Sequence, residues 1–197
     1  MVESVAKWVT DQISPQVLLK CPDDNNVEET WTYHQVHPSV LAMFVPTKDK
    51  VGPSMVPTIP SICVDLLDGD DRPFDMNGTS TIRLNISAWN PGTHGTELWE
   101  PQTDGSFVRS NAQDAMDVFT RNAEGWKDVW NVVDRIRGEL RNAVSIGDLR
   151  IKLEDGISYG PFLQEDAVSF DYPYWYAWVK FGVEYHDIAD TKFQDLL

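Results

Sequence analysis

The chain has 197 residues, of which 42% are hydrophobic and 24% are charged, the balance of an ordinary globular protein. Its 16 basic and 31 acidic residues give a formal net charge of −15. This charge argues against nucleic-acid binding through a basic patch, because that mode requires Lys and Arg to neutralise phosphates. The length and composition predict one folded domain and exclude disorder as the main state.

The two cysteines, Cys21 and Cys63, lie far apart and outside any CxxC motif. We therefore expect a reduced protein without a disulfide framework. The N-terminal sequence lacks the basic and apolar regions of a signal peptide, and no apolar run approaches the roughly 18 residues of a membrane span. These features predict a protein made and used in a soluble compartment, with no membrane partner.

The N-terminal part of the chain predicts one helix followed by short strands. Four apolar residues at helical spacing form a stripe that ends before Pro15: Val2, Val5, Val9 and Ile13. Residues 16–21 alternate as a short strand, and residues 40–46 are apolar enough for a buried strand confined by prolines. We expect an irregular excursion over residues 46–60, which contain four prolines and a glycine.

The middle of the chain predicts two strands joined by an acidic turn. Residues 60–67 are largely apolar, and residues 79–89 alternate cleanly between apolar and polar side chains. This alternation is typical of a sheet with one covered face. Residues 68–78 between them are rich in Asp and Gly, which favour turns. Residues 90–108 predict a long polar loop, of a kind that in a small domain is usually functional or disordered.

The C-terminal part predicts a helix and two further strands. Residues 112–119 hint at one or two helical turns, and residues 149–153 alternate as a strand that turns at 154–156. Residues 174–185 are rich in aromatic residues and valine and are the most β-prone run of the chain. We expect a flexible tail over residues 187–197. The predicted fold class is α+β: a mainly antiparallel or mixed sheet with one long amphipathic helix and an N-terminal helix packed on one face.

The predicted long helix is the sequence GWKDVWNVVDRIRGEL, residues 125–140. Its apolar residues recur at offsets that form one continuous stripe: Trp126, Val129, Trp130, Val133, Ile136 and Leu140. The charged residues fall elsewhere and are interpreted as a solvated face. We expect the stripe to pack against the sheet, and partner binding is the alternative.

The sequence offers few candidate residues for metal binding or catalysis. His34 and His37 lie three residues apart, but their surroundings look extended and no Cys or carboxylate completes a zinc set. The acidic stretch from Asp65 to Asp75 lacks the glycine and glutamate positions of a calcium loop and is better explained as a turn. No GxSxG, GxGxxG, P-loop or HExxH motif occurs. We therefore expect a protein that is not an enzyme, with no catalytic residue, metal or cofactor.

Several aromatic residues are candidate interface residues. The final strand places both apolar and aromatic residues on each of its faces, so one face is expected to pack the core and the other to meet a loop or partner. Trp89 likewise falls on the otherwise polar face of its strand. The interface candidates are Trp89, Tyr174, Tyr176 and Trp178. Local cover by a loop is the alternative.

Four pieces, taken in order, resemble the tail terminator or tail completion proteins of long-tailed bacteriophages and phage-tail-like particles. They are PSICVDLLDGDD, TIRLNISAWNPG, GWKDVWNVVDRIRGEL and GPFLQEDAVSFDYPYWYAWVKFGVEY. The resemblance covers roughly residues 58–186, and its most specific parts are the start of the helix and the YPYWYAWVKF strand. We expect a single domain over residues 1–197, in which the resemblance covers the core in 58–186 and the sequence pattern predicts an N-terminal helix and irregular arm in 1–57 and the flexible tail in 187–197.

The resemblance implies a structural virion protein. In such families six copies typically form a ring on the head-proximal end of the tail tube, which stops tube polymerisation and joins the tail to the neck or connector. The expected partners are further copies of the chain, the tail tube protein and the neck or connector protein, while DNA passes through the ring without specific binding. The expected location is the virion tail, assembled in the host bacterial cytoplasm.

Two alternatives remain at the sequence level. A neck or head–tail joining protein, also called a head completion protein, would use a similar small domain. A metal-dependent hydrolase that uses the Asp65–Asp75 cluster is a remote alternative from a different class. The resemblance carries over no catalytic or interface residue.

Overall fold

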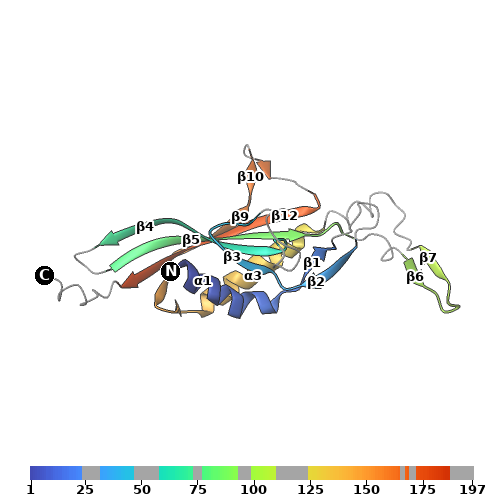
Figure 1. The fold of residues 1–197 in the computed structure, drawn as a ribbon, viewed down its shortest axis with the longest axis horizontal. Coiled ribbons are helices and arrows are strands. Elements are labelled where there is room, and N and C mark those ends of the chain that lie inside the picture. Colours follow the sequence, from blue (N-terminus) through green and yellow to red (C-terminus); the bar gives the residue numbers. More distant parts are fainter. Residues whose placement is uncertain are drawn as a thin grey trace.

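The computed structural model describes residues 1–23, 32–46, 58–72, 77–92, 99–109, 124–164, 167–168 and 172–186. The fold is α+β, with a curled mixed sheet of six strands, an N-terminal helix and one further helix (Figure 1). The helices cover one face of this sheet, and the opposite face, called the open face below, carries no helix of the described chain. No described helix has both the length and the apolar character needed to cross a membrane.

The main sheet has the strand order β3-β4-β5-β12-β9-β8. Its strands are β3 (Ser39–Ala42), β4 (Ser61–Arg72), β5 (Asn77–Trp89), β8 (Ser145–Ile146), β9 (Leu149–Pro161) and β12 (Tyr174–His186). β3 pairs with β4 in parallel, and all other neighbours are antiparallel. The remaining strands form hairpins: β1 (Leu19–Pro22) with β2 (Tyr33–Val36), β6 (Trp99–Pro101) with β7 (Phe107–Arg109), and β10 (Leu163–Gln164) with β11 (Ala167–Val168).

The helical layer has two parts. The first begins as α1 (Val2–Trp8) and continues through a π-helical segment, η1 (Val9–Ile13), and a 3-10 turn, η2 (Ser14–Gln16). The predicted stripe residues Val5, Val9 and Ile13 are fully buried, and the helix ends around Pro15 because proline cannot continue it. The second part is α3 (Trp126–Asn142), which packs on β5, β9 and β12.

The core lies between the helices and the inner face of the sheet. Alternate residues of the two central strands supply its floor: Ile82, Leu84, Ile86 and Ala88 from β5, and Ala177, Val179, Phe181 and Val183 from β12. The two strands pair over their full lengths, from Tyr174 opposite Trp89 to His186 opposite Asn77. This register places both apolar sets on one face, as the alternation in the sequence predicts.

Described residues before position 58, such as Val9 and Leu19, belong to the same core as the predicted 58–186 region. The N-terminal helix packs on β3 and β4, and β3 itself is a strand of the main sheet. The strand predicted over 40–46 is therefore real but shorter, because the chain leaves β4 after Ala42. Most of the predicted excursion over 46–60, the helical turns at 112–119 and the tail over 187–197 lie outside the described residues.

Two predicted connections are shorter than expected, and one predicted turn lies within a strand. The acidic stretch is strand up to Arg72, and β5 begins at Asn77, so the connection is shorter than residues 68–78. The turn predicted at 154–156 lies within the bounds of β9, where residues 153–156 form a bulge between the pairs Gly182–Lys152 and Phe181–Ile157 and Gly156 has φ of 79°. Part of the predicted loop at 90–108 is the β6–β7 hairpin. Strand pairing overrode local turn preference in the acidic stretch and in the β6–β7 hairpin, because turn propensity carries no information on distant partners.

Candidate functional site

The open face of the sheet is polar along its central strand. The β5 side chains that alternate with the core residues are only half buried: Thr79, Thr81, Arg83, Asn85 and Ser87. The equivalent positions of β12 are Tyr176, Trp178, Lys180, Gly182 and Glu184. The face therefore combines a polar strip with two aromatic residues near one end.

Asp65 is the centre of a hydrogen-bond network on this face. Arg83 Nη2 donates to Asp65 Oδ2 at 3.2 Å, and Asn85 Nδ2 donates to the same oxygen. The Cys63 thiol donates to Asp65 Oδ1 at 3.5 Å. Burial, together with the neighbouring Asp65 carboxylate, raises the pKa of Cys63 to about 12. The carboxylate therefore has protein partners on both oxygens, and the thiol is held in its neutral form.

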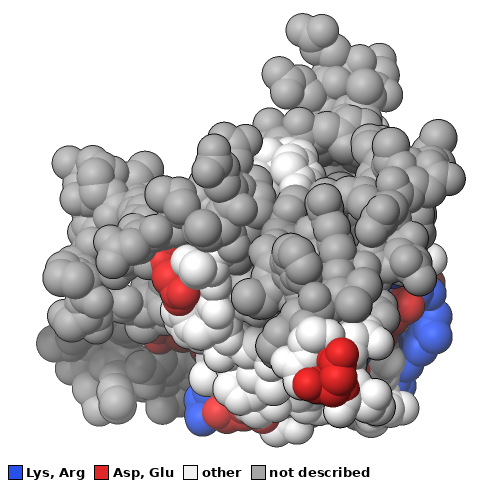
Figure 2. All heavy atoms as spheres, turned by 90° about the vertical axis from the view of Figure 1, so that its right-hand side faces the viewer, with Lys and Arg blue, Asp and Glu red and all other residues white. Residues whose placement is uncertain are grey.

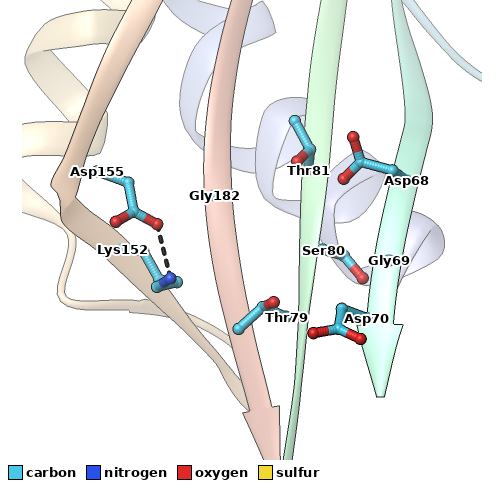
Figure 3. A pocket seen from close by; sticks show the side chains of 9 residues that line it. All are labelled: Asp68, Gly69, Asp70, Thr79, Ser80, Thr81, Lys152, Asp155 and Gly182. Atoms are coloured by element: carbon cyan, nitrogen blue, oxygen red, sulfur yellow. Dashed lines mark ion pairs between the residues drawn. The ribbon is translucent and has the colours of Figure 1, made fainter. Parts of the chain in front are cut away.

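A shallow trough crosses the open face where β4, β5, β12 and β9 lie side by side (Figure 3). The hollow has a volume of about 290 Å³ and is lined by Asp68, Gly69, Asp70, Thr79, Ser80, Thr81, Lys152, Asp155 and Gly182. Lys152 Nζ is paired with Asp155 Oδ2 at 2.6 Å. Since the lining holds three carboxylates and one ammonium group, the trough is net acidic and disfavours phosphate.

The aromatic interface candidates of β12 are held by neighbouring segments. Trp178 Nε1 donates to the carbonyl oxygen of Pro161 at 2.9 Å, and the ring of Tyr176 meets Phe162 edge-on with centroids 6.4 Å apart. Tyr174 is 36% exposed and is the most accessible of the three predicted residues in β12. Local cover therefore accounts for much of the apolar character of this face.

Trp89 is covered within the chain, which is the alternative that the sequence left open for this interface candidate. It is 1% exposed, and the ring of Tyr33 from the β1–β2 hairpin lies 6.4 Å away, centroid to centroid. Alternation along β5 does not show whether another segment covers this end of the strand, so the sequence left both possibilities open. Trp89 therefore contributes to packing in the single chain.

The apolar stripe of α3 is shifted from its predicted position. Val129, Val133, Ile136 and Leu140 are buried, and so is Val132, which the predicted stripe omitted. Trp130 is partly buried and meets Tyr159 edge-on at 6.2 Å. Trp126 is 45% exposed, so its place in the core stripe is wrong. The buried stripe includes Val132 and is therefore rotated around the helix away from Trp126, which lies at its margin.

The residues considered for metal binding do not assemble into a ligand set in the described part of the chain. His34 Nδ1 lies 2.7 Å from Asp23 Oδ1, whereas His37 Nδ1 lies 2.7 Å from the Val17 carbonyl oxygen. Asp71 accepts a hydrogen bond from the Tyr185 hydroxyl, and Asp75 lies outside the described residues. No group of three or more metal-capable side chains occurs among the residues that were described.

One edge of the sheet combines exposed apolar side chains with carboxylates, and we call it the acidic edge. It consists of Met43, Phe44, Val45, Leu66 and Leu67, together with Asp68 and Asp70, whose side chains also line the trough on the open face. β3 pairs with β4 only from Ser61 to Val64, and the Met43 amide then donates to the Val64 carbonyl oxygen at 2.9 Å. From Asp65 onward, β5 is the sole pairing partner of β4 within the described ranges.

The opposite side of the sheet has a basic counterpart between α3 and β9, which we call the basic edge. A hollow of about 300 Å³ is lined by Arg137, Arg141, Leu153, Gly156 and Ile157. The Arg137 guanidinium lies 4.0 Å from the ring centroid of Tyr159 and pairs with Asp134 at 2.7 Å. Arg141 is exposed and has no carboxylate partner among the described side chains.

Neither edge was identified from the sequence. Phe44 belongs to an apolar run and Leu66 lies next to charged residues, which is the sequence signal for these edges. Sequence alone does not show which of these residues are left uncovered by other segments. On the end of the molecule that faces the viewer in Figure 2, the described acidic side chains lie in separate patches and the described basic ones lie at the margins. Compared with known proteins, the chain matches no protein-family model and no curated protein sequence.

Proposed function

We propose that the chain is a structural protein of a phage tail or phage-tail-like particle that forms a ring at the head-proximal end of the tail tube. The ring stops tube polymerisation and joins the tail to the neck or connector. The four sequence pieces that resemble tail terminator proteins motivate this proposal. In this reading α3 is the long amphipathic scaffold helix of the domain, and the assembled protein resides in the virion tail.

The observation that carries the proposal is the distribution of exposed apolar side chains. Five of them gather at the acidic edge: Met43, Phe44, Val45, Leu66 and Leu67. Leu153 and Tyr159 are exposed at the opposite side of the sheet. Exposed apolar patches mark protein–protein contacts, and contacts on opposite sides of one chain support a ring rather than an isolated pair.

The charge of the chain fits a ring through which DNA passes. The net charge is −15, and the trough on the open face is net acidic. Acidic walls repel the phosphate backbone, so DNA would slide past them without being held. The proposal therefore requires no DNA-binding residue and no catalytic residue.

The location of the chain in an assembled particle tests this proposal. Gold-labelled antibody against the chain, imaged on intact particles and on isolated tails, should mark one position at the head-proximal end of the tail tube. Label that stays with isolated heads and is lost from isolated tails would assign the chain to the neck instead. An absence of label from intact and from partially dissociated particles, with a tube-protein antibody as the positive control, would contradict a virion role.

A further inference from the structure

The acidic edge has the features of an unfilled contact surface. Phe44 is 68% exposed and Met43 is 55% exposed, although both follow directly on a strand of the main sheet. Met43 has φ of 66°, an uncommon backbone conformation for a residue other than glycine, and it turns the chain away from β4. Beyond Val64 this edge of β4 has no pairing partner among the described residues, and exposed strand edges favour association with another chain.

The basic edge offers the matching chemistry. Leu153 is 40% exposed at the rim of a hollow of about 300 Å³, and Arg137 and Arg141 line the same hollow. Arg137 is already engaged by Asp134 and Tyr159, whereas Arg141 has no such partner in the described part of the chain. On the acidic edge, Asp68 likewise has no ion-pair partner among the described residues. Each edge therefore combines apolar surface with one unpaired charge, and the two charges have opposite sign.

The two edges cannot meet within one copy. The acidic edge is carried by β3 and β4 and the basic edge by α3 and β9, and β5 and β12 lie between them in the sheet. Two copies in the same orientation can bring them together. A contact between two different surfaces of identical chains is head-to-tail, and it generates a closed ring when the rotation between copies closes.

We propose that the acidic edge of one copy docks into the basic edge of the next copy. The exposed side chains around Phe44 and Leu66 fill the hollow beside Leu153, and Asp68 faces Arg141. This inference names the self-contact of the proposed ring and rests on the proposed function in that respect. Charge complementarity selects a second copy as the occupant, because the same chain carries both halves.

A charge-reversal experiment tests the contact. The full chain, Asp68→Lys and Arg141→Glu are compared by sedimentation velocity over a concentration series at low salt. We expect the full chain to form oligomers that weaken with salt, and each single reversal to raise the dissociation constant by about tenfold or more. An equimolar mixture of the two variants should associate like the unmodified chain, because each reversed charge then meets an opposite charge on the other variant.

Matched controls separate this effect from net charge. Asp104→Lys changes the net charge by the same amount as Asp68→Lys, but on the β6–β7 hairpin, which projects from the other end of the molecule (Figure 1). Lys7→Glu, on α1, changes the net charge by the same amount as Arg141→Glu. Both should associate like the unmodified chain. Phe44→Ser should weaken association without rescue by either variant. Circular dichroism shows whether each variant is folded. We expect all of them to fold, because Asp68, Arg141 and Phe44 are exposed.

The outcomes separate the inference from the proposed function. A full chain that stays monomeric, single reversals without effect, or a mixture that fails to associate would each overturn the edge-to-edge contact, even if the chain still marked the end of the tail tube. Rescue in the mixture supports the contact, even if the particle label placed the chain outside the virion. In that case the proposed function would fail and the contact would stand.

Discussion

Arg83 on β5 donates to Asp65 on the neighbouring strand β4 at 3.2 Å, and this pair lies on the face of the sheet that the helices leave open. The two side chains are 34% and 19% exposed, so solvent screens the pair only in part. The same Asp65 oxygen accepts from Asn85. Asp65 thus links the side chains of two neighbouring strands and stabilises their pairing.

Removal of this carboxylate should destabilise the fold. We expect Asp65→Ala to lower the free energy of unfolding by about 1–3 kcal/mol, because Arg83 and Asn85 lose their acceptor in a partly buried position. Asp68→Ala, on the same strand but exposed, should change it by less than about 0.5 kcal/mol. Urea unfolding followed by tryptophan fluorescence measures both values. Equal values for the two variants would contradict the structural role of Asp65.

The shifted stripe of α3 gives a second prediction. Ile136 is fully buried and Trp126 is 45% exposed. Ile136→Ala should therefore cost about 2–5 kcal/mol through lost apolar contact and the cavity left behind. Trp126→Ala should cost less than about 1 kcal/mol, despite the larger side chain removed. Denaturant unfolding of the two variants, followed by circular dichroism, decides between the observed stripe and the predicted one. A larger cost at Trp126 would favour the stripe predicted from the sequence.

Two glycines around α3 should respond in opposite ways to the same substitution. A Cβ at Gly125 would lie 2.4 Å from Trp175 Nε1 and 2.5 Å from the Asn90 carbonyl oxygen, the two atoms of a hydrogen bond. A Cβ at Gly138, inside the helix, would meet nothing within 4 Å.

We therefore expect Gly125→Ala to lower the midpoint of thermal unfolding, with a cost of about 1–3 kcal/mol. Gly138→Ala should raise the midpoint and stabilise the chain by about 0.5–1 kcal/mol, since alanine loses less backbone entropy in a helix. Differential scanning calorimetry measures both changes. A stabilising Gly125→Ala would show that the helix does not begin as closely against Asn90 and Trp175 as the structure places it.

Cys63 should be unreactive in the folded chain. Its side chain is 3% exposed and its pKa is raised to about 12, so almost no thiolate is present at pH 8. Cys21 is buried as well. We expect a colorimetric thiol reagent to label neither cysteine of the native chain at pH 8 and both after unfolding in guanidinium. Rapid labelling of Cys63 in the native chain would contradict the packing around Asp65.

The raised pKa of Cys63 also predicts the direction of a pH effect. The folded chain keeps the thiol proton to higher pH than the unfolded chain does, so the contribution of Cys63 to stability is complete at pH values below 9.0, the ordinary value of the group. It should decline as the pH rises from 9.0 towards about 12. Cys63→Ser removes the titrating thiol from this buried position. The unfolding midpoint of the variant should therefore fall less steeply over that interval than that of the unmodified chain.

The sequence predicts the regular parts of this fold well, because hydrophobic alternation reports directly on burial. The alternation of Ile82, Leu84 and Ile86 identifies the core face of β5, and the spacing of Val5, Val9 and Ile13 identifies the buried side of the first helix. These patterns arise within one element and need no knowledge of its neighbours.

The parts that the sequence does not predict depend on distant neighbours. Trp89 is buried because Tyr33 covers it, and Asp68 lies in a strand because Thr81 pairs with it. The two edges follow the same logic in reverse, since Phe44 and Leu153 are exposed only because no described element covers them. Cover and its absence are properties of the tertiary fold, so no local pattern reveals them.

The most direct test of a ring at the tube end is an image of the chain together with tail tubes. Purified full chain is added to tubes assembled from the tail tube protein of the same particle, and the mixture is examined by negative-stain electron microscopy and mass photometry. The account predicts rings of about 130 kDa, the mass of six 22.4-kDa chains, bound at one end of tubes that no longer grow when more tube protein is added. A chain that remains at 22.4 kDa beside bare, growing tubes would contradict the account.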